Sequence, residues 1–425
     1  MRRAQVAALC LPALLLVGCG SPSRFTNTTT LASQTVNNTS AANSFTGQNN
    51  GNLGANNVSK VNIHSLLYSG NETKILAQFL VWFGQPNHMN VGYNSMDPAQ
   101  VKRQVEDMIS RGIDGVIIDW YGPNNFIDQA TQLVMKEAEK HSGFTFTIMI
   151  DRGAMGSNCN GCSSQDHLTQ LLKYVEQTYF PSPAYLTLNG QPVVTNFNLD
   201  SGNSLDWSAA NAALSKPPRF LFQDNDGFTH AMSDGSYSWV MPWAADYGLG
   251  YLSNFYQTGL SFSGKETMGA TYKGFDDSLA SWGSNRLMDQ QCGSTWLQTF
   301  SKANQLYSSG RQLPYLQVVT WNDYEEGTEI ESGIDSCFSL RASLSGSTLQ
   351  WSTSGNESTV DHYSVYASTD GQVLNELGQF KPGTHSVDLC SYSVQGESRM
   401  YVQAVGKPSL ANRMPAPVNY TPACH

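Results

Sequence analysis

Two carboxylates, Asp323 and Glu326, stand three residues apart in a stretch that also carries large aromatic side chains. They belong to the run LQVVTWNDYEEGTEIE, residues 316–331, which opens with the apolar and β-branched residues of a buried strand. In such a pair, one carboxyl group protonates a leaving oxygen while the other acts as base or nucleophile, which is what cleavage of a glycosidic bond requires. An acidic solvated loop is the alternative. Trp321 and Tyr324 favour a site, because a solvated loop has no need of large aromatics.

The elements that must position this pair follow from an alternation of strand-like and helix-like segments between residues 61 and 337. The clearest helix, 97–111, starts at Asp97-Pro98 and repeats apolar residues at helical spacing; 130–141 and 167–179 are similar. About eight such units predict an α/β fold, a (β/α)8 barrel. An open doubly wound sheet is the alternative, but no glycine-rich phosphate-binding turn follows the first strand. The strand candidates are 75–83, 115–120, 144–151, 192–197, 219–223, 238–243, 267–272 and 315–321.

The barrel fold predicts where the chemistry lies, because catalytic side chains of such barrels follow the strands at the C-terminal face. Polar and aromatic residues do follow the predicted strands, and as a group they indicate a cleft. For single positions, a capping Asp or a core Trp is the alternative, and we favour it for Asp224 and Trp239. The remaining candidates for this cleft are Asp119, Trp120, Tyr121, Asp151, Arg152, Asn196, Gln223, Trp243, Tyr272, Asp276, Trp321 and Asn322.

From residue 338 to residue 425 the sequence pattern differs from that of the barrel region. Short runs with period-2 alternation, separated by turn signals such as Asp370-Gly371, predict a small β-sandwich. We expect this domain to act as a spacer or to support the barrel rather than to bind sugar, since no surface row of aromatics is evident. Its aromatic residues resemble the core of a fibronectin type III domain: Trp351, Tyr363, Tyr366 and Tyr401.

The N-terminus has the pattern of a targeting segment: Arg2 and Arg3 precede an apolar stretch too short to anchor in a bilayer. The stretch ends in Leu-Val-Gly-Cys19, which resembles the lipobox of bacterial lipoproteins. That resemblance implies a signal peptide over 1–19, lipid on Cys19, and a flexible Ser/Thr/Asn-rich tether over 20–60. The protein would then be exported and held at the outer membrane or the cell surface. An ordinary secretory signal that contains a cysteine is the alternative.

Export permits disulfides, and six cysteines remain after Cys10 and Cys19 are set aside. Sequence alone does not choose among the 15 pairings of six cysteines. We expect neighbours to pair. A zinc site at Cys159 and Cys162 is the rival, although no two further ligands stand out. The expected pairs are Cys159–Cys162, Cys292–Cys337 and Cys390–Cys424.

The composition narrows the classes of molecule that this protein binds. A net charge of -10 and a pI of about 5.2 argue against nucleic acid. Charged residues make up 14% of the chain and aromatics 11%, which suits stacking on neutral sugars, although aromatic cores have the same composition. We expect no metal or organic cofactor, because the histidines lack ligand spacing.

Three parts of the barrel region resemble the glycoside hydrolases grouped around family 99 (endo-α-mannosidases) and family 71 (α-1,3-glucanases). The resemblance covers most of the barrel and none of the C-terminal domain. Its most specific motif is Trp-Asn-Asp-Tyr-Glu-Glu-Gly-Thr. The stretches that carry it are 91–97 with Met108 and 111–122, 183–185 with 189–194, and 274–277 with 320–331.

The resemblance implies roles for individual residues. Family 99 usually has Glu at both catalytic positions; the first deprotonates the 2-hydroxyl of the sugar and the second is the general acid. Family 71 has Asp and then Glu three residues on, as Asp323 and Glu326 are arranged here. The resemblance also implies that Asp151 contacts sugar hydroxyls. Weaker matches imply further substrate contacts at Arg152, Asn196, Tyr272 and Arg286.

The sequence therefore predicts a glycoside hydrolase that cleaves an α-linked glucan or mannan, with Glu326 as acid and Asp323 as base. Glu326 must keep its proton near neutral pH, and burial near Trp321 or repulsion from Asp323 would raise its pKa accordingly. Asp119 and Asp151 would accept hydrogen bonds from sugar hydroxyls. A non-catalytic glycan-binding lipoprotein, a polysaccharide-processing glycosyltransferase and a structural envelope lipoprotein are the alternatives. The rings expected to stack on sugar are Trp120, Tyr121, Trp243 and Tyr272.

Overall fold

The computed structural model describes residues 57–422 and 424, apart from 157, 158, 160 and 395. The expected signal peptide, Cys19 and nearly all of the expected tether lie outside the described residues. Val58 and Ser59 are fully buried, and the amide of Ser59 donates to the carbonyl of Leu410 (2.8 Å), so the folded part has begun by residue 58. No helix in the described part of the chain has the length and apolar character that crossing a bilayer requires.

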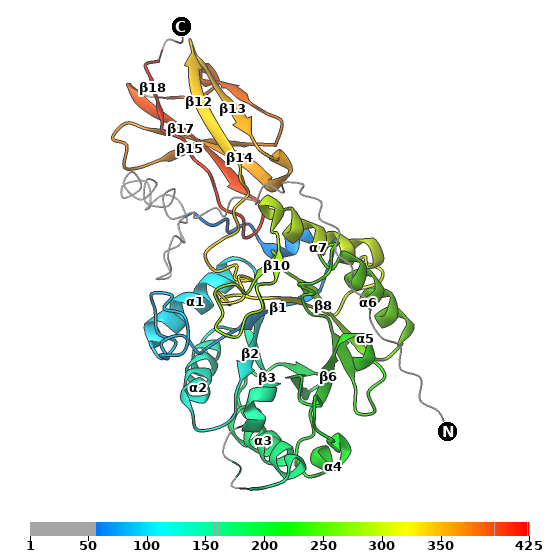
Figure 1. The fold of residues 1–425 in the computed structure, drawn as a ribbon. Helices are drawn as coiled ribbons and strands as arrows, with labels where there is room; N and C mark the ends of the chain where they lie inside the picture. The colour runs from blue at the N-terminus through cyan, green and yellow to red at the C-terminus, as the bar shows by residue number, and fades with distance from the viewer. Residues whose placement is uncertain (1–56, 157–158, 160, 395, 423, 425) are drawn as a thin grey trace, which may run out of the picture. The chain divides into compact units, whose positions relative to one another are not determined.

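Eight parallel strands of the described chain close into a barrel, with helices on its outside (Figure 1). Each strand pairs with the next along the chain, and the last pairs with the first, so the barrel prediction is confirmed and the open sheet is excluded. A two-residue strand, β4 (Thr187–Leu188), lies antiparallel to the start of the fourth barrel strand. The barrel strands are β1 (Lys74–Phe79), β2 (Gly115–Trp120), β3 (Thr145–Asp151), β5 (Gln191–Phe197), β6 (Arg219–Gln223), β7 (Gly235–Tyr237), β8 (Glu266–Thr271) and β11 (Tyr315–Val318).

One predicted strand is misplaced. Residues 238–243 do not form the sixth barrel strand, which is the shorter β7. The first residue of β7 is Gly235, and a larger residue would not fit there, because a Cβ would lie 2.3 Å from the carbonyl oxygen of Glu266 on the neighbouring strand. The apolar residues of 238–243, which suggest a strand, belong instead to a loop at the barrel mouth, where Trp243 is 71% exposed.

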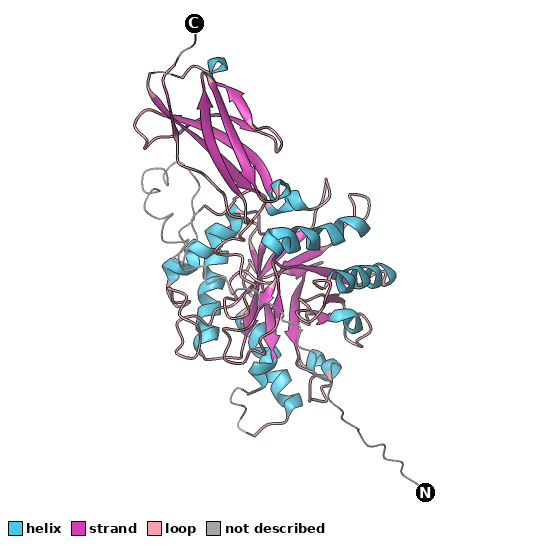
Figure 2. Ribbon diagram, turned by 45° about the horizontal axis from the view of Figure 1, so that its top comes forward, coloured by secondary structure: helices cyan, strands magenta, loops and turns pink. Residues whose placement is uncertain are grey.

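The helices connect the strands and cover the barrel, as Figure 2 shows with helices in cyan around strands in magenta. Asp97 caps α1 by accepting a hydrogen bond from the amide of Ala99 (2.9 Å), and Val101, Val105 and Met108 are buried along the helix. A short hairpin of β9 (Phe275–Asp276) and β10 (Leu287–Met288) follows β8. The helices are α1 (Pro98–Ser110), α2 (Phe126–Ala138), α3 (Ser164–Thr178), α4 (Trp207–Ala212), α5 (Asp224–Gly227), α6 (Leu249–Ser261) and α7 (Ser294–Leu306).

The C-terminal residues form two antiparallel sheets around a core of their own. Trp351 and Tyr363 lie in that core, as expected. Tyr366 and Tyr401 do not; they pack with Leu374 in a separate small cluster, because they point to the other face of their sheet. One sheet contains β12 (Ser339–Ser345), β13 (Thr348–Ser354) and β16 (Ser386–Asp388), and the other β14 (Val360–Ser368), β15 (Asn375–Phe380), β17 (Ser398–Gly406) and β18 (Val418–Tyr420).

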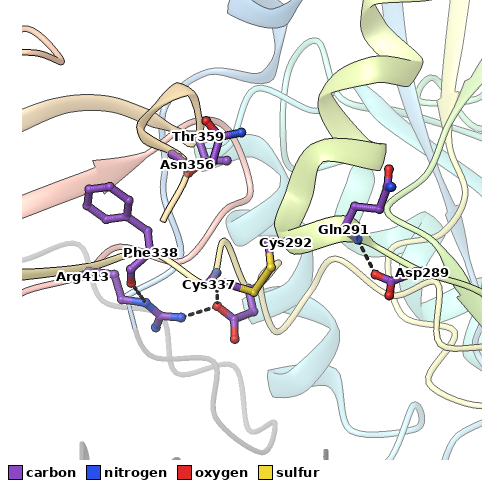
Figure 3. Close-up of a disulfide and its surroundings, with 9 residues drawn as sticks. Asp289, Gln291, Cys292, Cys337, Phe338, Asn356, Thr359 and Arg413 are labelled. Atoms are coloured by element: carbon purple, nitrogen blue, oxygen red, sulfur yellow. Dashed lines mark hydrogen bonds and ion pairs between the residues drawn. A yellow bond between two sulfur atoms is a disulfide. The ribbon is translucent and has the colours of Figure 1, made fainter. Parts of the chain in front are cut away.

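The six cysteines that remain after residue 19 form three disulfides, Cys159–Cys162, Cys292–Cys337 and Cys390–Cys424. The second joins the chain just before α7 to the chain that leaves the barrel (Figure 3). Near it, the guanidinium of Arg413 donates to the carbonyl of Phe338 (3.2 Å). The disulfide and this hydrogen bond therefore hold the segment between the barrel and β12.

Candidate active site

A hollow opens where the barrel strands end, and we call it the central hollow. Asp323 and Glu326 both line it, and residues from the ends of β1, β2, β3 and β5 line it with them. This is the place at which a barrel of this kind carries its chemistry. The lining residues are Gln78, Leu80, Trp82, Asp119, Tyr121, Met149, Asp151, Phe197, Trp239, Trp282, Thr320, Asp323 and Glu326.

A tight turn after β11 holds the carboxylate pair. Oδ1 of Asp323 accepts hydrogen bonds from the amides of Glu325 (3.0 Å) and Glu326 (2.8 Å). The amide of Asp323 donates in turn to Oγ1 of Thr320 (2.8 Å), whose side chain also lines the hollow. Since Oδ1 is engaged by the backbone, proton transfer by Asp323 falls to its other oxygen.

Burial and mutual repulsion alter the acidity of the carboxyl groups in the central hollow. Burial raises the pKa of Glu326 to about 7, although the charge of Arg286 acts against the shift. Burial, followed by the charge of Glu326, raises the pKa of Asp323 well above its usual value, and the two amide hydrogen bonds oppose this. Because like charges disfavour each other, the pair retains a proton at a pH where isolated carboxyls have none. A general acid needs that proton.

Three other predicted residues meet the pair in the hollow: Asp119, Tyr121 and Asp151. Burial raises the pKa of Asp151 to about 6, and burial followed by the charge of Asp151 raises the pKa of Asp119 well above its usual value. Oδ1 of Asp119 is buried and has no hydrogen-bond partner among the described residues, so it is an acceptor left for a ligand. The ring of Tyr121 lies against Gly153, where a Cβ would approach it to 2.4 Å.

With this geometry in view, the comparisons identify the family. The model of glycosyl hydrolase family 71 matches residues 86–335, more than half of the chain and the segment that contains both Asp323 and Glu326. The chain belongs to glycosyl hydrolase family 71. It is therefore a glycosidase, as the sequence predicts.

Solved structures resemble this family 71 protein at low sequence identity. The endo-α-mannosidase of family 99 from Bacteroides thetaiotaomicron in complex with bis-tris propane is 18% identical with a TM-score of 0.50, covering 61% of this chain and 87% of that one. Another structure of that enzyme is 16% identical with a TM-score of 0.48, covering 61% and 87%. A glycoside hydrolase-like protein is 14% identical with a TM-score of 0.49, covering 62% and 88%. The likeness at a TM-score of 0.50 concerns the fold alone. The search of curated proteins finds no match.

Three aromatic residues predicted to face substrate are core residues of the family 71 barrel. Trp120 points away from the hollow, because side chains alternate along β2, and its Nε1 donates to Oδ1 of Asp128 (3.0 Å). Tyr272 is fully buried, and its hydroxyl donates to the carbonyl of Tyr247 (2.9 Å). Trp321 is fully buried beneath the guanidinium of Arg111, 4.8 Å from the ring centroid.

Three polar candidates also lie away from the central hollow. Asn322 is buried and clamps the backbone of Leu80, accepting from its amide (2.9 Å) and donating to its carbonyl (2.8 Å). Asn322 therefore positions Leu80 in the wall of the central hollow and does not itself line that hollow. Asn196 is buried at the border of a neighbouring depression, and Arg152 is exposed outside the hollow.

Trp243 and Arg286 border a second hollow, which we call the Trp243 hollow. It shares Phe197, Trp239 and Glu326 with the central hollow. Nε of Arg286 donates to Oδ2 of Asp277 (2.7 Å), which holds the guanidinium at the edge of this hollow. These two predicted residues therefore lie close to Glu326 of the carboxylate pair.

The sequence interpretation missed three tryptophans that line the central hollow. Trp82 falls inside the predicted first strand, which actually ends at Phe79, and Trp239 was expected in the core. Trp282 lies between β9 and β10, where no strand signal points to it. The available signal was the chain turn at residues 84–86, Gly-Gln-Pro, which indicates that the segment before it leaves the barrel.

One further cluster has metal-ligand chemistry. Ligand atoms of Cys159, Cys162 and His167 lie within 4.8 Å of one another. The two sulfurs are bonded to each other, so they are not available as thiolates, and these residues do not line the central hollow.

Proposed function

We propose that this family 71 enzyme hydrolyses an α-linked glucan or mannan, with Glu326 as general acid and Asp323 as base. The observation that carries the proposal is the meeting of both carboxyl groups in one hollow with Asp119, Asp151 and aromatic side chains. The Asp-x-x-Glu spacing, which resembles that of family 71, supports it. The family 99 endo-α-mannosidase has a similar barrel, which is why mannan stands beside glucan as the substrate.

Glu326 transfers its proton to the glycosidic oxygen while the bond between that oxygen and the anomeric carbon breaks. Its pKa of about 7 keeps this proton available near neutral pH. Asp323 removes a proton either from a water molecule or from a neighbouring sugar hydroxyl, which then attacks the anomeric carbon. Burial raises the pKa of Asp323, and the two amide donors act against this rise and fix its Oδ1 in place, which supports its assignment as the base.

Asp119 and Asp151 hold the sugar in place by accepting hydrogen bonds from its hydroxyls. The partnerless Oδ1 of Asp119 supports this role. Burial raises the pKa of Tyr121 far above its usual value, so its phenol stays protonated and donates. Tyr121, Trp82 and Trp239 supply the apolar faces on which a sugar ring stacks.

The test is hydrolysis of α-1,3-glucan and of α-mannan by the purified mature protein. We expect release of reducing sugar by the wild type and a loss of about 10²–10⁴-fold in kcat for Glu326→Gln. Glu72→Gln, the same change at an exposed position, is the matched control. Equal turnover by Glu326→Gln would remove the assignment of the acid. Transfer to a sugar acceptor in place of water would favour a glycosyltransferase, and binding without turnover a glycan-binding protein.

We also propose that the enzyme is exported and carries lipid on Cys19, because a lipobox-like sequence precedes that residue. Expression of Cys19→Ser in a bacterial host is expected to move the protein from the membrane fraction to the soluble fraction. Unchanged membrane association would contradict the anchor.

A further inference from the structure

The turn after β11 carries a third acid, Glu325, which the proposed mechanism does not use. The lining of the central hollow does not include it, and its side chain is only 4% exposed. Burying a carboxylate is costly unless hydrogen-bond donors compensate it. The loop after β1 supplies them: Oε1 of Glu325 accepts from the amide of Met89 (2.9 Å), and Oε2 lies 2.9 Å from Nδ1 of His88.

Two consecutive turns in the loop after β1 bring His88 to this position. The amide of Gln85 donates to the carbonyl of Trp82 (3.3 Å), and the amide of His88 donates to the carbonyl of Gln85 (3.2 Å). Pro86 is the second residue of the second turn, where its fixed φ is favoured. The imidazole of His88 thereby returns to the indole of Trp82 and stacks on it, with ring centroids 4.8 Å apart and an interplanar angle of 10°.

The imidazole of His88 contacts two tryptophans in the wall of the central hollow. Besides stacking on Trp82, it stands edge-on to Trp282, with ring centroids 5.9 Å apart and an interplanar angle of 72°. Stacked and edge-to-face contacts hold aromatic rings in preferred orientations. One side chain therefore joins the aromatic wall of the hollow to the turn that carries the carboxylate pair.

The hydrogen bond of His88 reaches the carboxyl group of Asp323 through Glu325. A carboxylate only accepts hydrogen bonds, so Nδ1 of His88 carries the proton in this contact. The backbone amide of Glu325 donates in turn to Oδ1 of Asp323 (3.0 Å). A fixed Glu325 therefore fixes the direction of the Asp323 carboxyl group. Such positioning matters because general base catalysis requires heavy atoms within about 2.6–3.2 Å of each other.

We propose that His88 is a positioning residue with two separable functions. Its Nδ1 holds the turn of Asp323 and Glu326 in place through Glu325, which serves the chemical step. Its ring holds Trp82 in the wall of the central hollow, which serves the binding of sugar. The inference rests on the proposed function and adds to it a residue that lies outside the carboxylate motif and outside the lining of the central hollow.

Two substitutions separate these functions. The amide nitrogen of Asn lies where His88 has Nδ1, so His88→Asn keeps the donor and loses the ring, whereas His88→Phe keeps a ring and loses the donor. Kinetics are measured on whichever of α-1,3-glucan and α-mannan the wild type hydrolyses. We expect His88→Phe to lower kcat roughly 10- to 100-fold with KM near that of the wild type. We expect His88→Asn to raise KM about two- to tenfold with kcat near that of the wild type.

The matched control is His385→Phe, because His385 also contacts a glutamate, Glu357 (2.9 Å), but lies in the C-terminal domain. This variant is expected to keep the wild-type kcat and KM. Any pattern other than the crossed one would overturn the inference. Equal losses in His88→Phe and His88→Asn would show a merely structural role, and wild-type constants in either variant would remove the corresponding function.

Failure of the proposed function gives a different result, namely no hydrolysis by the wild type. Hydrogen–deuterium exchange of the amides of Glu325 and Glu326 then tests the inference, because it needs no substrate. We expect faster exchange of both amides in His88→Phe than in the wild type and in His88→Asn. Equal exchange in the three proteins would overturn the proposal that His88 holds the turn.

Discussion

At the scale of single residues, the turn after β11 gives the two carboxyl groups different environments. Oδ1 of Asp323 is held by two backbone amides, whereas Glu326 lies on the wall shared by two hollows. The pair is therefore not symmetric, although both groups are carboxylates with raised pKa values. Such a difference of environment is how two carboxyls acquire separate acid and base roles.

Substitution Asp323→Asn separates the charge of this residue from its structural hydrogen bonds. The amide oxygen of Asn still accepts from the two backbone amides, so the turn and the melting temperature are expected to stay close to wild type. The base is lost, and we expect kcat to fall about 10²–10⁴-fold. Steady-state kinetics and thermal unfolding measure the two effects. A fully active Asp323→Asn enzyme would exclude Asp323 as the base.

The raised pKa of Glu326 has a consequence for stability. Its folded-state value of about 7 exceeds the ordinary value of 4.5, so the native state binds this proton more tightly than the unfolded chain does. That contribution is fully present below pH 4.5 and is lost as the pH rises through about 7. Glu326→Gln keeps a neutral group at every pH, and we expect its melting temperature to exceed that of the wild type at pH 8 but not at pH 4.

Thermal unfolding of both proteins across this pH range measures the difference, with Glu72→Gln as the exposed control. A constant offset between Glu326→Gln and wild type at all pH values would show that the Glu326 carboxyl is not buried as described.

At the scale of the elements, the turn that carries Asp323 and Glu326 is fastened to the end of the first barrel strand. Asn322 clamps the backbone of Leu80 just after β1. This contact joins the ends of the first and last barrel strands beyond their ladder. The fully buried guanidinium of Arg111, at the end of α1, holds the chain after the turn by donating to the carbonyls of Ile330 (2.8 Å) and Glu331 (2.7 Å).

Asn322→Ala removes this clamp and leaves the buried amide and carbonyl of Leu80 without these partners. Each unsatisfied buried group costs about 1–3 kcal/mol, so the two groups predict a loss of roughly 2–6 kcal/mol in the free energy of unfolding. We also expect a lower kcat, because Trp82 follows Leu80 in the wall of the central hollow. Urea denaturation measures the free energy of unfolding, and steady-state kinetics measures kcat. Wild-type stability of Asn322→Ala would show that the clamp contributes nothing.

At the scale of the whole molecule, contacts between distant parts of the chain join the barrel to the C-terminal domain. Nε1 of the buried Trp296 in α7 donates to the carbonyl of Pro408 (2.9 Å), and Leu410 belongs to the apolar core of the barrel. The Cys292–Cys337 disulfide adds a covalent link at the same boundary. These contacts support the expectation that the domain stabilises the barrel.

Replacing Cys292 and Cys337 together by Ser is expected to lower stability by roughly 2–4 kcal/mol, since the link closes a loop across a sequence separation of 45. Activity at 25 °C should persist, because neither residue lines the central hollow. Thermal unfolding with and without reductant measures the effect. An equal melting temperature for the variant and the oxidised wild type would contradict this role.

Much of the fold of this protein can be predicted from local patterns in its sequence. The barrel is predictable because its buried strands alternate with amphipathic helices, and Asp323 and Glu326 are predictable because a polar turn must follow the last buried strand. The sixth strand was misplaced for the same reason, since the apolar residues of the mouth loop at 238–243 have the composition of a strand whereas the true β7 does not.

The tertiary structure alone decided which side chains face the hollow. Asp119 and Trp120 are neighbours in sequence, yet the pleat of β2 turns one into the site and the other into the core. Trp82, Trp239 and Trp282 come from distant segments, and only closure of the barrel brings their rings around the carboxylate pair. The sequence determines the period and the chemistry of each segment, whereas side-chain direction depends on register and on long-range packing.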